Sequence, residues 1–599
     1  MTQSAPAGGK TFFGHPRGLA ILFFTEMWER FSYYGMRGLL ILYLTQHFLF
    51  SDERSALLYG AYTALVYVMT IIGGTLADRY LGQRKAVTYG AILLVLGHFG
   101  MAFEGAGSRE ILTYQGQEYQ VTLDGRGGDA SQIIIADSGQ SLIRFEDNAT
   151  RMVIDQPAAV GLPASIAVAD YTTRIEQQPL YVNILYLSLA LIIAGVGYLK
   201  ANISTIVGSL YSLEDKRRDS GFTIFYMGIN LGSFLSAILC GYLGIAYGWK
   251  YGFGLAGLGM LAGLGVFLWG QKWLEGRAEP PDPAKLRERV FGPVTVEMAC
   301  YGVGLVIIAV SMLLVMKSHL IPDWFVGALG IAIVIAFIAY AVFKLEGDER
   351  PRMLAALYFI LAQIPFWALF EQAGSSLNLF TDRLVDRTMF GWSVPAPVFQ
   401  FLNAGYIVIF APIIAWMWTA LARRGREPSA PLKFSFGVFG VGLGFLALVA
   451  GMKAGGPTGL TAVYYIFLIY WIHTMAELML SPVGLSTVTK LAPARVVGLS
   501  MGAWFLYSGL SNYLAGVIAR STGAETIGGQ LTNVAAAKAT YAEVYTNVAY
   551  VAMAIAVVML LLVPVIKRMM RLDTLKGDPA ADVGNVEGHG MNRHERFET

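Results

Sequence analysis

The sequence predicts an all-α polytopic membrane protein with two bundles of six helices, an inserted two-helix hairpin and a small β-rich insert. Three observations predict this class. The 599 residues have a mean hydropathy of +0.53 with only 14% charged residues, apolar runs of twenty residues or more recur, and one long polar stretch interrupts them. A helix of about 20 residues crosses roughly 30 Å of hydrocarbon. We therefore expect helices in a lipid bilayer, and an ordinary soluble globule is excluded.

About fourteen candidate spans follow one another along the chain. Basic residues gather in alternate loops between them, and these loops all fall on one side of the membrane if both termini are cytoplasmic. The spans lie at residues 17 to 49, 54 to 81, 84 to 104, 182 to 211, 219 to 247, 249 to 274, 293 to 317, 323 to 344, 350 to 379, 396 to 423, 431 to 453, 460 to 491, 494 to 521 and 539 to 571.

The polar stretch at residues 105 to 180 lies between the third and fourth spans. It divides the first half of the N-terminal bundle, residues 1 to 104, from the rest of that bundle, residues 181 to 274. Short runs of alternating apolar and polar residues predict strands, so we expect a β-rich insert on the extracytoplasmic, periplasmic face. A disordered loop is the alternative.

The seventh and eighth spans carry almost no polar residue in their middle. Such helices have no group with which to bind a solute, so we expect a lipid-facing hairpin within a linker at residues 275 to 349. The C-terminal bundle then occupies residues 350 to 572, and residues 573 to 599 form a cytoplasmic tail. Two bundles of six suggest internal repeats with a site between them near the midplane of the membrane.

Charged residues inside the apolar runs are the main functional signal, because a charge at the bilayer centre costs roughly 2.5 to 3.5 kcal/mol on insertion scales. Glu26, Glu29 and Arg30 are three and four residues apart in the first span, so they project from one helix face within mutual reach. Two carboxylates that share one guanidinium can take up and release a proton as their partners move. A static ion-pair cluster that holds helices together is the alternative.

Further charges lie in other spans. Arg37 follows in the first span, Lys200 lies in the fourth, and Glu371 and Glu477 lie in the second bundle. Cations from one bundle would then face carboxylates from the other. A zwitterionic peptide fits such a cavity, with its carboxylate toward the cations and its ammonium toward Glu477.

The segment EMWERFSYYG at residues 26 to 35 resembles the ExxER(F/Y)xYYG signature of the proton-dependent oligopeptide transporter family, a branch of the major facilitator superfamily. Similar motifs recur over nearly the whole chain, except in the insert and the tails. They include GTLADRYLG at 74 to 82, FYMGIN at 225 to 230, FW, EQ and SSL between 366 and 377, FQFLN at 399 to 403, the run from Glu477 to Ser486, and Trp504. The resemblance implies the major facilitator fold and a symporter that imports di- and tripeptides with protons by alternating access.

The resemblance also implies roles for particular residues. Arg37 and Glu371 would form a gate pair, while Asn403 and Glu477 would hold the amino end of the peptide. The residues implied in proton coupling are Glu26, Glu29, Arg30, Lys200 and Glu371. Those implied in substrate binding are Arg30, Tyr33, Tyr34, Arg37, Tyr67, Lys200, Asn230, Asn403, Glu477 and Trp504. The tyrosines have the alternative of simply packing the bundle. Animal members of the family carry a histidine near the position of Gly60, so the glutamates here must carry the proton.

Several alternatives stay open at the level of function. A related carrier for nitrate or a drug-like solute would have the same fold, although the Glu477 carboxylate weighs against nitrate. A membrane enzyme would need machinery such as HExxH or Gly-x-Ser-x-Gly, and neither motif occurs, so we expect no enzyme and no cofactor or metal. A receptor that docks a partner through the insert is the third alternative.

The expected partners are protons, di- and tripeptides and the lipid bilayer. The net charge of +3 gives no reason to expect a nucleic acid, because the basic residues sit in short loops beside the spans. The resemblance to bacterial members places the chain in the bacterial inner (plasma) membrane as a multi-pass protein, and we expect a monomer.

Overall fold

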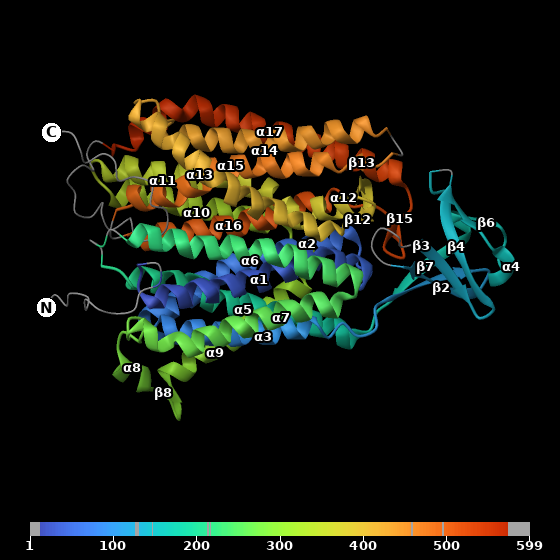
Figure 1. The fold of residues 1–599 in the computed structure, drawn as a ribbon, viewed down its shortest axis with the longest axis horizontal. Coiled ribbons are helices and arrows are strands. Elements are labelled where there is room, and N and C mark those ends of the chain that lie inside the picture. Colours follow the sequence, from blue (N-terminus) through green and yellow to red (C-terminus); the bar gives the residue numbers. More distant parts are fainter. Residues whose placement is uncertain are drawn as a thin grey trace.

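The computed structural model describes residues 12, 14 to 125, 131 to 146, 148 to 212, 215, 217 to 456, 459 to 493 and 496 to 572. Within these ranges, fourteen helices of 19 residues or more run side by side along the longest axis of the molecule (Figure 1). Eleven of the described helices are long and apolar enough to cross a membrane. The predicted tail at residues 573 to 599 lies outside the described residues.

The first bundle contains six long helices around one apolar core. These are α1 (Arg17–Gln46), α2 (Asp52–Leu76), α3 (Gln83–Met101), α5 (Pro179–Ser209), α6 (Arg218–Ala246) and α7 (Trp249–Gly270). Glycines allow close approach within this bundle: a Cβ atom on Gly73 of α2 would collide with the carbonyl of Gly197 on α5. Small residues at such contacts let helices pack in lipid, where the hydrophobic effect does not drive association.

The second bundle also contains six long helices around its own core. These are α11 (Glu349–Phe370), α13 (Phe401–Arg423), α14 (Ala430–Ala454), α15 (Tyr464–Leu491), α16 (Val497–Arg520) and α17 (Val534–Met569). The major facilitator architecture of two six-helix bundles is therefore present as predicted.

One predicted span is broken. The sequence predicts a continuous helix over residues 350 to 379, but α11 ends at Phe370, a 3-10 turn follows at Glu371–Gly374, and α12 (Ser376–Leu384) starts anew. Ser375 leaves the helical region with φ −122° and ψ −103°. Gly374 packs so closely on Tyr59 of α2 that a Cβ atom would collide with its hydroxyl group. The close contact with the opposite bundle thus explains where the helix breaks.

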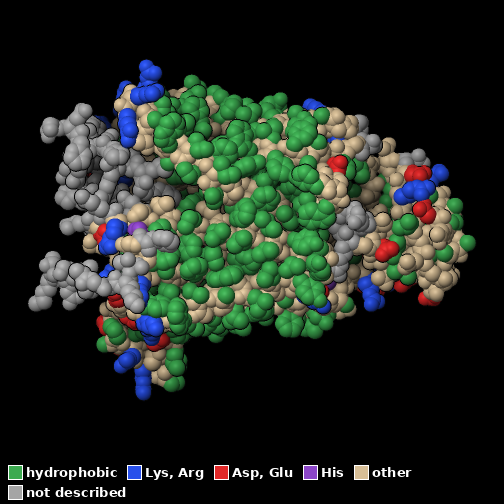
Figure 2. All heavy atoms as spheres, viewed as in Figure 1, with side chains coloured by type: hydrophobic (Ala, Val, Ile, Leu, Met, Phe, Trp, Pro, Cys, Tyr) green, Lys and Arg blue, Asp and Glu red, His purple; other side chains and the backbone are tan. Residues whose placement is uncertain are grey.

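The hairpin of α9 (Val296–Met316) and α10 (Asp323–Lys344) joins the bundles. Helix α9 packs on α5 and α2 of the first bundle, whereas α10 packs on α11 and α16 of the second. Most large apolar side chains of α10 are exposed, as expected of a lipid-facing hairpin. Figure 2 shows a broad hydrophobic band over the helices, with the charged side chains near its two ends.

The predicted β-rich insert is present as one seven-stranded sheet with the order β6-β5-β4-β3-β2-β1-β7. All its neighbouring strands are antiparallel, with Leu112 opposite Tyr119 and Val121 opposite Ile134. These four side chains belong to a small core of its own, so the alternation seen in the sequence has one buried face. The strands are β1 (Arg109–Tyr114), β2 (Gln117–Asp124), β3 (Ser131–Ala136), β4 (Gly139–Glu146), β5 (Arg151–Ile154), β6 (Ser165–Ala167) and β7 (Tyr171–Glu176).

The insert lies at one end of the helices, opposite the end at which α1 begins and α17 ends (Figure 1). This end of the helices is called the insert end below. The remaining short elements lie in loops: α4 (Pro157–Val160), α8 (Pro283–Arg287), β8 (Arg289–Phe291), β9 (Val294–Thr295), β10 (Val385–Asp386), β11 (Thr388–Met389), β12 (Trp392–Ser393), β13 (Thr461–Ala462), β14 (Thr526–Ile527) and β15 (Gln530–Leu531).

Candidate functional site

Three charged residues are buried together in the middle of α1. Arg30 Nε donates to Glu26 Oε1 over 2.7 Å and lies 3.0 Å from Glu29 Oε2. The second contact lacks hydrogen-bond geometry, so neither carboxylate oxygen of Glu29 has a hydrogen-bond partner among the described residues. The contact that the i, i+3 and i+4 spacing predicts is therefore present, but one guanidinium does not satisfy two buried carboxylates.

Lys200 completes the charge balance of this α1 cluster. It lies on α5 within electrostatic range of Glu26, Glu29 and Arg30. Its Nζ atom lies 4.0 Å from the ring centroid of Tyr67 on α2, and both side chains are partly exposed. A lysine over an aromatic face gains cation–π attraction, which holds the ammonium while it stays accessible. Two carboxylates and two cations can thus be neutral together, and each charge that moves away changes the balance.

The tyrosines of the signature lie one helical turn further along α1. The Tyr33 and Tyr34 rings meet edge to face with centroids 5.3 Å apart, and Arg30 lies 6.0 Å from the Tyr33 ring. Tyr33 is buried, whereas Tyr34 is partly exposed. Asn230 on α6 donates its amide to the Tyr226 carbonyl of its own helix over 3.1 Å. Tyr34 is consequently the better placed of the two tyrosines to meet a solute.

The second bundle contributes a carboxylate and an amide. Asn403 Nδ2 on α13 donates to Glu477 Oε2 on α15 over 2.8 Å and lies 3.1 Å from Thr474 Oγ1. Glu477 is within electrostatic range of Tyr34 and Tyr226 in the first bundle, so the groups predicted from the two halves face one another. A carboxylate with only an amide donor beside it retains capacity to accept from a cationic ligand group.

Trp504 is placed differently from the other predicted substrate contacts. It lies on α16, is only 7% exposed and belongs to the apolar core of the second bundle. Its carbonyl accepts a hydrogen bond from Gln363 Nε2 over 3.1 Å. In this conformation Trp504 is mainly a packing residue.

The predicted gate residues meet across the two bundles. Arg37 on α1 forms an ion pair with Glu371 in the 3-10 turn after α11, and both side chains are buried. Arg37 Nε also donates to Tyr59 Oη over 2.7 Å. The break in the helix that follows Phe370 therefore presents the Glu371 carboxylate to the opposite bundle.

Further polar contacts between the bundles were not predicted from the sequence. Arg383 on α12 forms a bidentate ion pair with Asp52 of α2, at 2.6 and 3.0 Å, and both side chains are buried. Asn378 donates to the Gly38 carbonyl over 2.8 Å, and Gln46 bonds the Asp382 carboxylate over 2.8 Å. Asp52 follows the capping residue Ser51 and so resembles an ordinary first-turn acid, and no local pattern links it to Arg383, 331 residues away.

All these contacts between the bundles lie at the insert end. Helix α2 also packs directly on α16 there, with Gly60 so close to Gly516 that a Cβ atom on either glycine would collide with the other backbone. Ion pairs and close backbone packing therefore close the molecule at this end.

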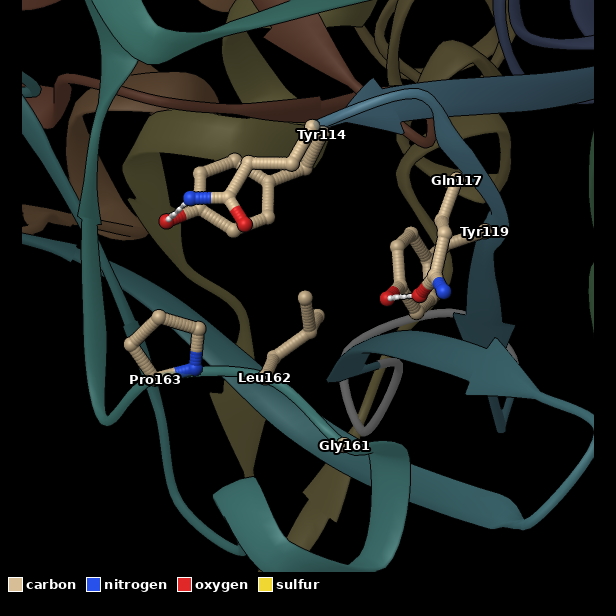
Figure 3. Close-up of a pocket in the computed structure, with 7 residues that line it drawn as sticks. Tyr114, Gln117, Tyr119, Gly161, Leu162 and Pro163 are labelled. Atoms are coloured by element: carbon tan, nitrogen blue, oxygen red, sulfur yellow. Dashed lines mark hydrogen bonds between the residues drawn. The ribbon is translucent and has the colours of Figure 1, made fainter.

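Two hollows lie around the insert, away from the buried charges. One, of about 220 Å³, is enclosed by Tyr114, Tyr119, Leu162 and Pro163, with the Tyr119 hydroxyl donating to Gln117 (Figure 3). The other, of about 630 Å³, lies between the insert and the helix ends. Neither hollow is lined by a residue predicted to bind substrate or protons.

Comparison with known proteins gives a consistent result. The model of the POT family matches residues 84 to 535. The uncharacterized transporter YclF of Bacillus subtilis is 33% identical over 95% of this chain and 98% of its own length. The peptide transporter YePEPT of Yersinia enterocolitica is 32% identical, covering 86% of this chain and 90% of its own. The crystal structure of a peptide transporter POT in complex with sulfate is 32% identical, with a TM-score of 0.70, covering 94% of this chain and 97% of that one.

Proposed function

Since the chain belongs to the POT family, we propose that it is a proton-coupled symporter that imports di- and tripeptides by alternating access. The curated relative YePEPT is a peptide transporter, which supports the substrate class. We assign the protein to the bacterial inner membrane as a monomer.

The observation that carries the substrate proposal is the opposition of charge between the bundles. Arg30, Arg37 and Lys200 come from the first bundle, and the Asn403–Glu477 pair comes from the second. A di- or tripeptide has a carboxylate and an ammonium group separated by a short backbone. Its two ends can therefore contact both bundles at once, and binding favours the conformations in which the bundles lie close together.

The proton would act on the two buried groups of carboxylates. A proton on Glu371 removes the charge that holds Arg37 across the bundles, which releases the guanidinium for the peptide carboxylate. A proton on Glu29 leaves Arg30 shared with Glu26 alone and alters the field at Lys200. Because the groups in each cluster interact, they titrate as sets, and the coupling belongs to the clusters.

The orientation follows from the basic residues at the end opposite the insert. Exposed cations gather there beside the helix ends, in α8 and β8 and in the loop after α13. The positive-inside tendency would place this end in the cytoplasm. The insert would then face the periplasm, and both termini would be cytoplasmic.

The proposal is tested by uptake of labelled dialanine into liposomes that hold the purified protein, with an imposed inward proton gradient and the voltage clamped by valinomycin. We expect accumulation that an uncoupler abolishes and unlabelled trialanine competes away. Binding of the same dipeptide by the folded protein without gradient-driven accumulation would contradict proton coupling. Neither binding nor uptake by folded protein would contradict the peptide as substrate and favour another solute on the same fold.

A further inference from the structure

The insert contacts the opposite bundle as well as its own. The insert connects α3 to α5 of the first bundle, whereas the β14–β15 hairpin connects α16 to α17 of the second. Gly528 of the hairpin donates its backbone N–H to Glu110 Oε2 of β1 over 2.6 Å. Gln132 Nε2 of β3 donates to the Ile527 carbonyl over 2.5 Å and lies 3.4 Å from that of Gln530. Three hydrogen-bond contacts thus cross from one bundle to the other outside the membrane helices.

This contact is packed in the manner of a protein interior. The Ile527 side chain is 9% exposed and belongs to the apolar core of the insert, together with Val121 and Ile134. Glu110, which accepts from Gly528, is only 4% exposed. The second bundle therefore contributes one side chain to the core of a domain that belongs to the first.

The hairpin itself is shaped for this position. Thr526 pairs with Leu531 and Ile527 with Gln530, which leaves Gly528 and Gly529 as a two-residue turn. Their φ angles of +60° and +82° are of the kind that glycine adopts without strain. A Cβ atom on Gly529 would lie 3.2 Å from the Thr45 carbonyl at the end of α1. The turn is held between the insert on one side and α1 on the other.

The placement of this contact gives it a mechanical consequence. It joins the bundles at the insert end, where Arg37–Glu371 and Asp52–Arg383 also join them. When the bundles rock apart at this end, the hairpin moves with the second bundle and the insert with the first. Ile527 must then leave an apolar core, and Glu110 and Gln132 must exchange their partners for water.

We propose that the insert is a strap that holds the periplasmic end of the transporter closed by gripping the β14–β15 hairpin of the opposite bundle. The proposal rests on the alternating-access part of the proposed function, because it concerns the conformation in which the insert end opens. The strap favours the conformation described here over the opened one, and it must be released once in every transport cycle.

The test follows the opening directly and does not require transport. Spin labels on Glu53→Cys of α2 and Asp386→Cys of β10, both exposed at the insert end, report the separation of the bundles by double electron–electron resonance. The buried Cys240 and Cys300 are first replaced by alanine. Ile527→Ser and Gln132→Ala should each shift the distance distribution toward longer separations. The matched control is Leu142→Ser, which changes an exposed side chain of β4 outside the contact.

A covalent lock supplies the opposite perturbation. Gln132→Cys joined to Gln530→Cys by a short bifunctional thiol reagent with a cleavable disulfide should abolish the long-distance population and restore it on reduction. Distance distributions that are the same for Ile527→Ser, Gln132→Ala and Leu142→Ser would overturn the proposal. So would long separations that persist in the locked protein. A protein that opens as expected but transports no peptide would contradict the proposed function and leave the strap intact.

Discussion

Glu29 is the residue at which the charge balance of the α1 cluster is least satisfied, and it lies opposite the bundle that holds Glu371. We predict that Glu29→Gln and Glu371→Gln each reduce gradient-driven uptake to the level of empty liposomes. A glutamine amide keeps the size of the side chain but cannot carry a proton. The measurement is uptake of labelled dialanine with and without the gradient.

The control for these substitutions is Glu176→Gln, an exposed glutamate at the end of β7. We expect it to transport like the unchanged protein. Exchange of peptide across the membrane without a gradient should survive in Glu29→Gln, because exchange needs no net proton movement. Gradient-driven uptake that stays intact in both glutamine variants would refute the assignment of the coupling proton.

Glu477 gives a second prediction at the level of single residues. Its carboxylate is held by Asn403 at 2.8 Å, and we expect it to accept the peptide ammonium. Loss of a hydrogen bond to a charged group costs about 1.5 to 3 kcal/mol, so Glu477→Gln should weaken dialanine binding about ten- to a hundredfold. N-acetyl-dialanine lacks the ammonium and should bind the two proteins nearly equally. Isothermal titration with both ligands makes the comparison, and an equal loss for both would rule out this contact.

The residue scale also shows what the sequence can predict about the site. Contacts within one helix follow from spacing, so the meeting of Glu26, Glu29 and Arg30 could be predicted. The Asp52–Arg383 pair could not, because its partners are far apart in the chain and Asp52 reads locally as a helix-start acid. A contact between distant residues is decided by the packing of the bundles, which no local pattern contains.

At the scale of elements, the apolar runs predict helices well because the bilayer fixes both their length and their internal hydrogen bonding. The predicted span at residues 323 to 344 has the bounds of α10, Asp323–Lys344. The break after Phe370 was missed because it comes from the contact of Gly374 with Tyr59 on another helix. The strands of the insert follow from alternation, but their docking on β14 and β15 does not.

The docking of the insert should depend on pH through Glu110. Burial raises the pKa of Glu110, and the hydrogen bonds from Gly528 and Thr173 offset this only in part. A raised pKa in the docked state means that docking favours the protonated form. Docking is therefore strongest below the ordinary pKa of a glutamate, and it weakens as the pH rises through the raised pKa of Glu110. The neighbouring acid Glu525 and the hydroxyl of Tyr171 face the same region.

Hydrogen exchange of the segment at residues 526 to 531 measures this docking. After correction for the intrinsic exchange rate, protection should fall with rising pH in the unchanged protein. The Glu110→Gln variant, which cannot ionise, should show a flat profile over the same range. A profile that falls equally in both proteins would assign the pH dependence to another group.

At the scale of the whole molecule, three cores divide the labour. The cores of the two bundles contain no residue of the seven-stranded sheet, while the core of the insert takes only Ile527 from the helical part. The bundles should therefore fold without the insert. The insert instead acts on the balance between the closed and opened conformations, because it contacts both bundles at one end.

Removal of the insert separates these two roles. Helices α3 and α5 pack against each other, so residues 106 to 178 can be replaced by a short Gly/Ser linker. Burial of an isoleucine contributes about 1.5 to 3 kcal/mol, so the loss of Ile527 docking alone should shift the conformational equilibrium roughly ten- to a hundredfold toward the opened form. The shortened protein should still bind dialanine and accumulate it, with a larger population of long distances between labels at Glu53→Cys and Asp386→Cys. A shortened protein that is folded and binds peptide but never opens at this end would show that the insert is needed for opening and does not restrain it.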